Sequence, residues 1–395
     1  MKTNKKPKRS ADDVLAMFRD TPAPLTTEKD ALTFDYALMA VRNYHMCRAT
    51  NKLSPRVSGE IIRVVDATVN SKLGKKFDRD VIFALKMLAY TCSEEGVAFI
   101  ARMIQRGYEA DSYYWLAALE PFGQGHPYAS TLFDTISKSL PEKFLAVCLL
   151  DAANEAAREH KLKKHPFDSA AGAAKLAGFL SNRDKSEASY AVSACAALPF
   201  ISESRRWPLV ELARKHKSRA VRREVAWATA KMGKKTGLDH LVEQCLDPNT
   251  SIQAIAYLEE LGKKKLVPAT AREPDFAATA EMCHWLSDGH EVGEPPDSIK
   301  LLDKRTMYWP PTRDTRELRL FHFVYKKSRE RGERIDGVGM VGSMTWSFFD
   351  ETRPTMKPEE IYGHHCCLEL ELNNDPRAPK KRTGKAGWEL VKARK

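Results

Sequence analysis

Apolar residues recur at three- and four-residue spacing from Glu28 to about Pro166. Side chains at this spacing share one face of an α-helix. In the segment Asp80–Tyr90, for example, Val81, Leu85 and Leu88 fall on one face. Glycine and proline residues divide the rest of the region into helical segments of similar length, namely Glu94–Arg106, Asp111–Leu119, Pro127–Leu140 and Pro141–His160. The pattern predicts a stack of helices for this part of the chain.

The next region, from Phe167 to about Gly289, repeats a pair of helical segments. The glycines that close two of these pairs, Gly233 and Gly262, lie 29 residues apart, and Leu212 and Leu241 show the same offset. A period of about 30 residues built from helix pairs is typical of a solenoid. Each repeat of a solenoid buries its apolar face only against its neighbours.

The second helix of each pair carries a recognisable pattern of residues. Matching positions are Val221, Arg222, Arg223, Ala226, Met232 and Gly233 in one copy, and Asp247, Pro248, Ile252, Ala256, Leu261 and Gly262 in the next. In these positions the sequence resembles the HEAT-repeat family, although Gln253 replaces the arginine that is usual there. The resemblance implies a curved helical scaffold with a concave binding face. Such scaffolds serve many functions, so the fold alone names none.

The pattern changes from Leu301 onward. The segments Glu317–Tyr325 and Val338–Phe349 are rich in β-branched and aromatic residues, and Cys367–Leu372 alternates apolar with charged positions. Each of the three is typical of a strand. The segment Pro358–Tyr362 has a proline where a helix would begin. These features predict a small α+β domain.

The predicted fold class is therefore mainly α, a HEAT-like α-α superhelix (solenoid) followed by a small C-terminal α+β domain. The expected organisation is a basic disordered arm at 1–25, a helical region at 26–166, HEAT-like repeats at 167–300, the α+β domain at 301–373 and a basic disordered tail at 374–395.

The charge of the chain is unevenly distributed. The net charge is +12, of which residues 1–10 contribute +5 and residues 376–395 contribute +7. Residues 11–375 are therefore neutral overall. The basic character of the chain lies in its two ends, and by itself it does not make the folded part a nucleic-acid-binding protein.

One internal segment is nevertheless strongly basic. Between Ser204 and Lys235 the chain carries eleven Lys and Arg residues against two Glu. Cations on a helical face beside tryptophans, here Trp207 and Trp227, suit a nucleic-acid backbone and its bases. A solvated face or a surface for an acidic protein partner explains the same residues, and Arg222 occupies the position of a structural arginine in HEAT repeats. The candidate binding residues are Lys215, Arg219, Arg222, Arg223, Lys234 and Lys235.

Two other motifs are weaker indications of a functional site. Residues 337–342 match G-x-G-x-x-G, but strand-forming residues follow where a dinucleotide site needs a helix. His364, His365, Cys366 and Cys367 are adjacent, so their side chains diverge and one metal ion could bind only one or two of them. We therefore expect no catalytic site, cofactor or metal. The eight cysteines are scattered without a C-x-x-C pair, which indicates a reduced intracellular protein.

We expect a non-catalytic helical-repeat scaffold that binds a protein partner, in the cytoplasm, or in the nucleus of a eukaryotic cell. No apolar run reaches the ~18 residues that a membrane span needs, so we expect no membrane partner. The alternative is a nucleic-acid-binding protein that uses the basic helical pair and the tails. That alternative includes DNA repair, in the manner of the HEAT-like alkylpurine DNA glycosylases, whose catalytic motif has no match here.

Overall fold

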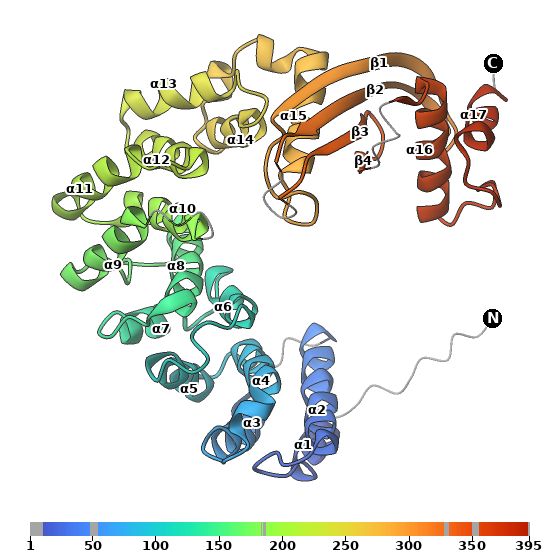
Figure 1. Cartoon of the computed structure of the whole chain (residues 1–395). Coiled ribbons are helices and arrows are strands. Elements are labelled where there is room, and N and C mark those ends of the chain that lie inside the picture. The colour runs from blue at the N-terminus through green and yellow to red at the C-terminus, as the bar shows by residue number, and fades with distance from the viewer. Residues whose placement is uncertain are drawn as a thin grey trace. The chain divides into compact units, whose positions relative to one another are not determined.

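A computed structural model describes residues 11–47, 54–182, 184, 187–327, 332–349 and 355–393. The chain forms two compact units, Met1–Ala228 (unit 1) and Thr229–Lys395 (unit 2). The fold class is as predicted: mainly α, with a small α+β region near the C-terminus (Figure 1). Residues 1–10 of the arm predicted at 1–25 lie outside the described residues.

Unit 1 consists of helices joined by short turns. Their bounds are α1 (Ala11–Arg19), α2 (Glu28–Cys47), α3 (Ser54–Val69), α4 (Asp78–Thr91), α5 (Glu94–Gln105), α6 (Tyr114–Gly123), α7 (Ala129–Ile136), α8 (Lys143–Arg158), α9 (Ala170–Ser181), α10 (Ala188–Ala197), α11 (Glu203–Arg214) and α12 (Arg219–Lys231). The predicted helical segments all contain a helix. The boundary between the two units falls within α12.

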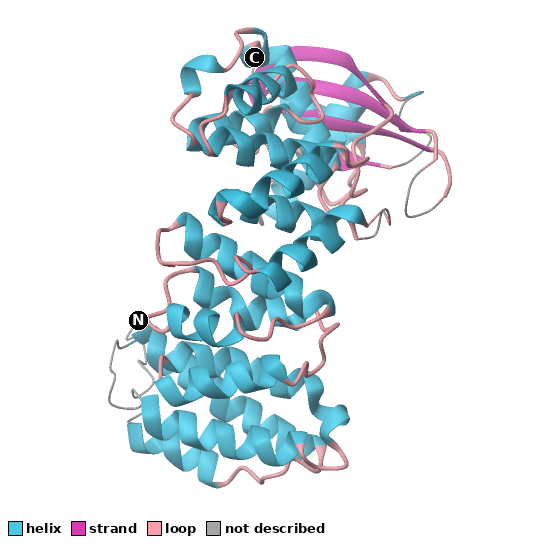
Figure 2. Ribbon diagram, turned by 90° about the vertical axis from the view of Figure 1, so that its left-hand side faces the viewer, coloured by secondary structure: helices cyan, strands magenta, loops and turns pink. Residues whose placement is uncertain are grey.

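Alternate helices of unit 1 pack against one another in two rows. In one row α2 contacts α4, α4 contacts α6, α6 contacts α8 and α8 contacts α10. In the other, α1 contacts α3, α3 contacts α5 and α5 contacts α7. Helix α4 shows why, since Val81, Leu85 and Leu88 are fully buried on the face that the apolar spacing predicted. This arrangement is that of an α-solenoid in general terms (Figure 2).

Three buried histidines connect turns of unit 1 to preceding segments through hydrogen bonds. The Nδ1 atom of each accepts the backbone N–H two residues later, from Tyr128, Phe167 or Ser218. The opposite nitrogen then carries the proton and donates it. His126 donates to the carbonyl of Ala89 (2.9 Å), His165 to Asn154 Oδ1 (3.2 Å) and His216 to the carbonyl of Asn182 (3.1 Å).

Unit 2 begins with helices and ends with a sheet between helices. Its elements are α13 (Lys235–Gln244), α14 (Ser251–Glu260), α15 (Pro274–Leu286), β1 (Ser298–Trp309), β2 (Asp314–Tyr325), β3 (Ile335–Val341), β4 (Trp346–Phe348), α16 (Pro358–Leu372) and α17 (Gly384–Lys392). The strands form an antiparallel sheet in the order β1-β2-β3-β4. The predicted strand Glu317–Tyr325 is confirmed within β2, and the predicted strand Val338–Phe349 contains the end of β3 and all of β4.

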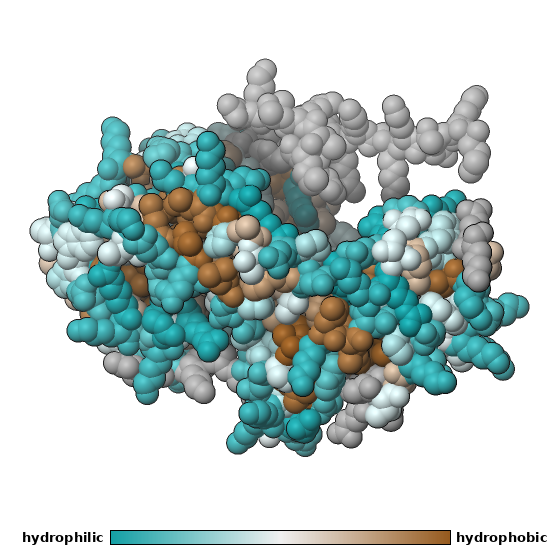
Figure 3. Space-filling view, turned by 90° about the horizontal axis from the view of Figure 1, so that it is seen from above, coloured by the Kyte–Doolittle hydropathy of each residue, from teal (hydrophilic) through white to brown (hydrophobic). Residues whose placement is uncertain are grey.

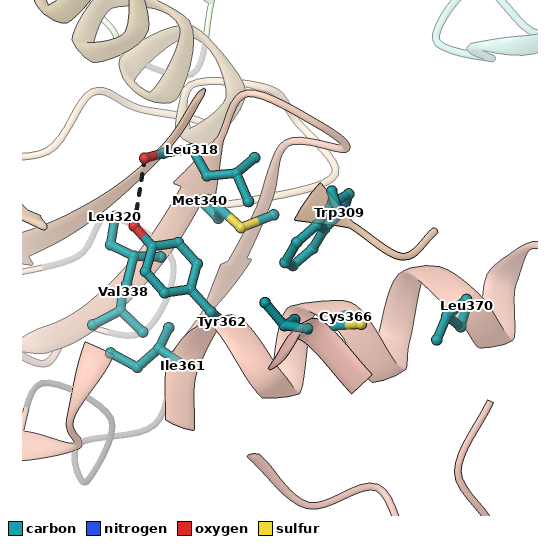
Figure 4. Packing of buried hydrophobic residues seen from close by; sticks show 10 residues of the cluster. Trp309, Leu318, Leu320, Val338, Met340, Ile361, Tyr362, Cys366 and Leu370 are labelled. Atoms are coloured by element: carbon teal, nitrogen blue, oxygen red, sulfur yellow. Dashed lines mark hydrogen bonds between the residues drawn. The ribbon is translucent and has the colours of Figure 1, made fainter. Parts of the chain in front are cut away.

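Each face of the sheet buries a separate cluster of apolar side chains. Phe321 and Phe323 of β2 pack against α15, where Met282 is fully buried. Leu318 and Leu320 of the same strand pack with residues of α16 on the other face. Figure 4 shows this second cluster. The sheet is thus covered on both sides, as the alternation of side chains along a strand requires.

The segment Cys367–Leu372 was predicted to be a strand, and this prediction is wrong, because the segment ends helix α16. Buried residues of α16 include Ile361, Tyr362, Cys366 and Leu370, which follow a helical rather than an alternating period. Over only six residues, CLELEL, a helical pattern and an alternating pattern of apolar positions cannot be told apart. The first-turn proline predicted at Pro358 is confirmed.

The two predicted disordered ends are also corrected. Within 11–25 the chain forms α1, whose Val14 and Phe18 are fully buried. Within 374–395 it forms α17, which packs against α16. Apolar residues at helical spacing supply the reason, since each short helix buries one face while its cations remain in solvent. The α+β region accordingly extends from Ser298 to Lys392.

Candidate functional site

The basic segment covers α11, α12 and the start of α13, and its predicted binding residues fall in two units. Lys215, Arg219, Arg222 and Arg223 belong to unit 1, whereas Lys234 and Lys235 belong to unit 2. The six residues therefore form two groups, each with its own surroundings.

In unit 1 the predicted residues differ in what they contact. Arg222 Nη1 donates to the carbonyls of His216 (2.7 Å) and Lys217 (2.8 Å), so its guanidinium closes the turn before α12. Arg223 is half-buried, and its Nε has no hydrogen-bond partner among the described residues. Lys215 and Arg219 are exposed. The contacts of Arg222 support the structural interpretation of that residue.

In unit 2, Lys235 forms an ion pair with Asp239 at 2.7 Å, and Lys234 is exposed just before α13. Other cations of the basic segment are paired too. The nitrogen–oxygen distances are 3.0 Å for Arg205–Asp168, 3.0 Å for Arg214–Glu211 and 2.9 Å for Lys231–Glu260. Much of the local positive charge is therefore neutralised by nearby carboxylates.

Unit 1 also contains a cavity that the sequence analysis did not identify. It lies between α2, α4 and α6 and has a volume of about 420 Å³. Acidic, basic and aromatic side chains share its wall, which is formed by Asp35, Met39, Arg79, Asp80, Ile82, Phe83, Lys86, Tyr114 and Ala117. A concave site with a few polar groups among apolar ones is the usual form of a ligand pocket.

The two carboxylates of the cavity are poorly solvated. Burial raises the pKa of Asp35 above its usual value, and the neighbouring charge of Asp80 raises it further. Burial likewise raises the pKa of Asp80. The Oδ1 atom of Asp35 is buried and has no hydrogen-bond partner among the described residues. A buried acceptor without a donor is unfavourable, so this oxygen is a point at which a ligand would gain a hydrogen bond.

The two cations of the cavity are directed to other groups. The Arg79 guanidinium lies 5.9 Å from the centre of the Tyr114 ring. Lys86 Nζ lies 3.7 Å from Glu120 Oε2 and 5.9 Å from the centre of the Tyr90 ring. These are cation–π and ion-pair distances. Neither cation forms an ion pair within 4.0 Å with Asp35 or Asp80 in the described structure.

Large apolar side chains are exposed on the three helices that line the cavity. We call them the α2–α4–α6 face; they are Tyr36 and Met39 of α2, Tyr90 of α4, and Tyr113 and Leu116 of the α6 segment. Met39 lines the cavity, and Tyr90 and Tyr113 contact the wall residues Lys86 and Tyr114. Tyr36 and Tyr113 are 62% and 63% exposed. Figure 3 presents a different side of the molecule, seen from above Figure 1, where hydrophobic residues also gather in patches between hydrophilic ones.

The glycine motif of the sequence lies in the sheet of unit 2. Residues 337–341 of the glycine motif lie in β3, and no helix follows before β4. A Cβ at Gly337 would collide with the ring of Phe323, so sheet packing explains this glycine. Among the described residues, no three His, Cys, Asp or Glu side chains are placed to hold one metal ion. In that same set, no helix has the length and apolarity to cross a membrane.

Comparison of the chain with protein-family models, with curated proteins and with solved structures finds no match. The fold and the site define a mainly α-helical protein with the general form of an α-solenoid and a mixed polar and aromatic cavity. One signal in the sequence points toward that cavity. Asp35 and Asp80 each stand one turn from an apolar residue of the cavity wall, Met39 and Phe83.

Proposed function

We propose that this chain is a HEAT-like helical scaffold that binds a protein partner through the α2–α4–α6 face. The observation that carries the proposal is the exposure of five large apolar side chains on the three helices that line one cavity, namely Tyr36, Met39, Tyr90, Tyr113 and Leu116. Tyrosine is among the residues that contribute most to protein interfaces, because its ring buries a large area with little loss of conformational freedom. The basic segment supports the proposal less, since several of its cations already have acidic partners.

The proposal predicts that a charge on this face abolishes partner binding. Tyr36→Asp combined with Tyr113→Asp should lose a stoichiometric partner that the wild-type chain retains from native extract, because each carboxylate would be desolvated in the interface. Leu212→Asp is the matched control, because Leu212 is a 38% exposed apolar residue of α11 elsewhere in unit 1. Quantitative mass spectrometry of the captured protein provides the measurement.

The control should retain the partner, and circular dichroism should show that all variants keep their helices. Equal capture by the wild-type chain and the double variant would refute the role of this face. The absence of any stoichiometric partner would count against the scaffold function itself.

A second candidate function, nucleic-acid binding, is favoured by one observation. Lys215 and Lys217 are exposed at the turn between α11 and α12, and in the described structure neither has an ion pair. If this turn binds phosphates, Lys215→Glu with Lys217→Glu should reduce the affinity for duplex DNA and flatten its salt dependence, which titrations at several salt concentrations measure.

The contribution of the chain ends to DNA binding must be measured separately from that of the turn between α11 and α12, and without disturbing α17. Deletion of residues 1–10, together with Lys380→Gln and Lys381→Gln, removes cations while leaving α17 in place. If this variant loses all DNA binding, the turn between α11 and α12 is not the binding site.

A further inference from the structure

The cavity between α2, α4 and α6 has a charge requirement that its own residues leave unmet. Asp35 and Asp80 both contribute carboxylates, and the two repel one another. Asp35 Oδ1 is buried with no hydrogen-bond donor among the described residues. Asp35 as a whole is half-buried, and a carboxylate that loses part of its water is stabilised by an ion pair or a hydrogen bond. A positively charged donor in the cavity would meet both needs at once.

The charge of Arg79 counteracts the rise in the pKa of both carboxylates, but in the described part of the chain neither Arg79 nor Lys86 donates a hydrogen bond to Asp35 or Asp80. Lys86 pairs with Glu120 at 3.7 Å, and the Arg79 guanidinium lies over the Tyr114 ring. The wall itself carries two carboxylates and two cations. Because Lys86 is already paired with Glu120, which lies outside the wall, Arg79 alone remains to balance Asp35 and Asp80, and a ligand with one positive charge would complete that balance.

The remaining wall suits the stem of a long cationic side chain. Phe83 and Tyr114 provide aromatic surface, and Met39, Ile82 and Ala117 provide aliphatic surface. Arginine and lysine bury their methylene groups along such surfaces and place their charge on a carboxylate or an aromatic ring. We infer that the cavity binds one arginine or lysine side chain of a peptide segment that docks on the α2–α4–α6 face. This inference rests on the proposed function, because the face must bind a protein partner.

A peptide fits the surroundings better than a free amine. Met39 both lines the cavity and is 38% exposed, and Tyr113 packs on the cavity residue Tyr114 with ring centres 4.1 Å apart. Apolar surface therefore continues from the cavity wall onto the exposed face. The residues that flank the cation in a peptide would cover this surface, whereas a small amine would leave it in water.

Selection from a displayed library of random dodecapeptides tests the inference directly. The full wild-type chain is the bait, and peptides that also bind the Asp35→Asn variant are removed. Selected peptides should share one arginine or lysine. Replacing that residue by its neutral analogue, citrulline or acetyl-lysine, should weaken binding at least about tenfold in calorimetry, as expected for loss of a desolvated ion pair. Asp35→Asn and Asp80→Asn should weaken the unmodified peptide similarly.

Asp66→Asn provides the matched control, because Asp66 is an exposed acid of α3, in the other row of helices, and this change should leave the affinity unchanged. Selected peptides without a shared cation, or with equal affinity for wild type and Asp35→Asn, would overturn the inference. So would agmatine binding as tightly as the peptide, which would assign the cavity to free amines. Failure of the cation requirement while Tyr36→Asp with Tyr113→Asp still abolishes partner capture would leave the proposed function intact.

A stability measurement separates binding from folding. Asp35 has no partner for its buried oxygen, so Asp35→Asn should raise the thermal midpoint of the unliganded chain while it weakens peptide binding. A fall in the midpoint would mean that Asp35 stabilises the fold, and would overturn the assignment of this carboxylate to a ligand.

Discussion

His126, His165 and His216 show how single residues hold unit 1 together. Each ring bridges the backbone N–H two residues ahead and an oxygen in a preceding segment. Both ring nitrogens are therefore used, and each ring is held as the neutral tautomer with its proton on Nε2. This arrangement explains the three rings as parts of the fold. The sequence alone does not pair them with their acceptors, which lie 11 to 37 positions away.

The buried ring of His165 predicts a pH dependence of stability. Burial lowers the pKa of His165 to about 3 in the folded chain, whereas an unfolded histidine titrates near 6.5. Between these values the unfolded chain binds a proton that the folded chain does not, so the free energy of unfolding should fall as pH falls from about 6.5 toward 3. His126, whose pKa burial also lowers, adds to the effect.

Urea denaturation at several pH values measures this slope. His165→Gln should be less stable at pH 7 and should show a shallower loss between pH 6.5 and 4. His160→Gln serves as control, because His160 is exposed, and its slope should match that of the wild type. An unchanged slope in His165→Gln would contradict the assignment of the pH dependence to His165.

At the scale of elements, close contact between α16 and α17 depends on glycine. A Cβ at Gly387 of α17 would collide with the carbonyl of Gly363 in α16, and one at Gly363 would collide with the carbonyl of Gly384. The side chain of Thr383 caps α17 by accepting the N–H of Ala386 at 3.2 Å. These features hold α17 in place. The basic composition of this segment alone predicts disorder.

Gly387→Ala should therefore detach α17 and destabilise unit 2 by about 1–3 kcal/mol, the usual range for overpacking. Gly178→Ala in α9 is the matched control, because a Cβ added at Gly178 would meet no atom within 4 Å. It should raise stability by about 0.5–1 kcal/mol through helix propensity alone. Thermal unfolding gives both values, and amide exchange in α17 reports its detachment. Equal effects of the two substitutions would show that the contact is looser than described.

Elements with long, regular periodicity follow the sequence closely, whereas short ones depend on their partners. Helix α4 and strand β2 bury the side chains that their patterns select. Strand β1 carries exposed or half-buried residues along most of its length, because it is an edge strand, and its pattern is correspondingly weak. The six residues at the end of α16 fit both a helical and a strand pattern, and packing against the sheet determines that they form a helix.

At the scale of the whole molecule, the basic charge and the compact units follow different boundaries. The positive surplus lies in residues 1–10 and 376–395, yet the second of these stretches includes the folded helix α17. The basic segment crosses from unit 1 to unit 2 within α12. Net charge therefore describes the solvent-facing side chains, while apolar burial determines which residues belong to one unit.

The sequence by itself determines most helix positions in unit 1, the central strand β2, and the concentration of charge at the chain ends, because periodicity and charge are local properties. Only the tertiary structure decides that Asp35 and Asp80 share a cavity, since they come from helices more than forty residues apart in sequence. It also decides that Arg222 caps a turn and that α17 packs on α16. Desolvation and pairing depend on neighbours that only the packed helices bring together.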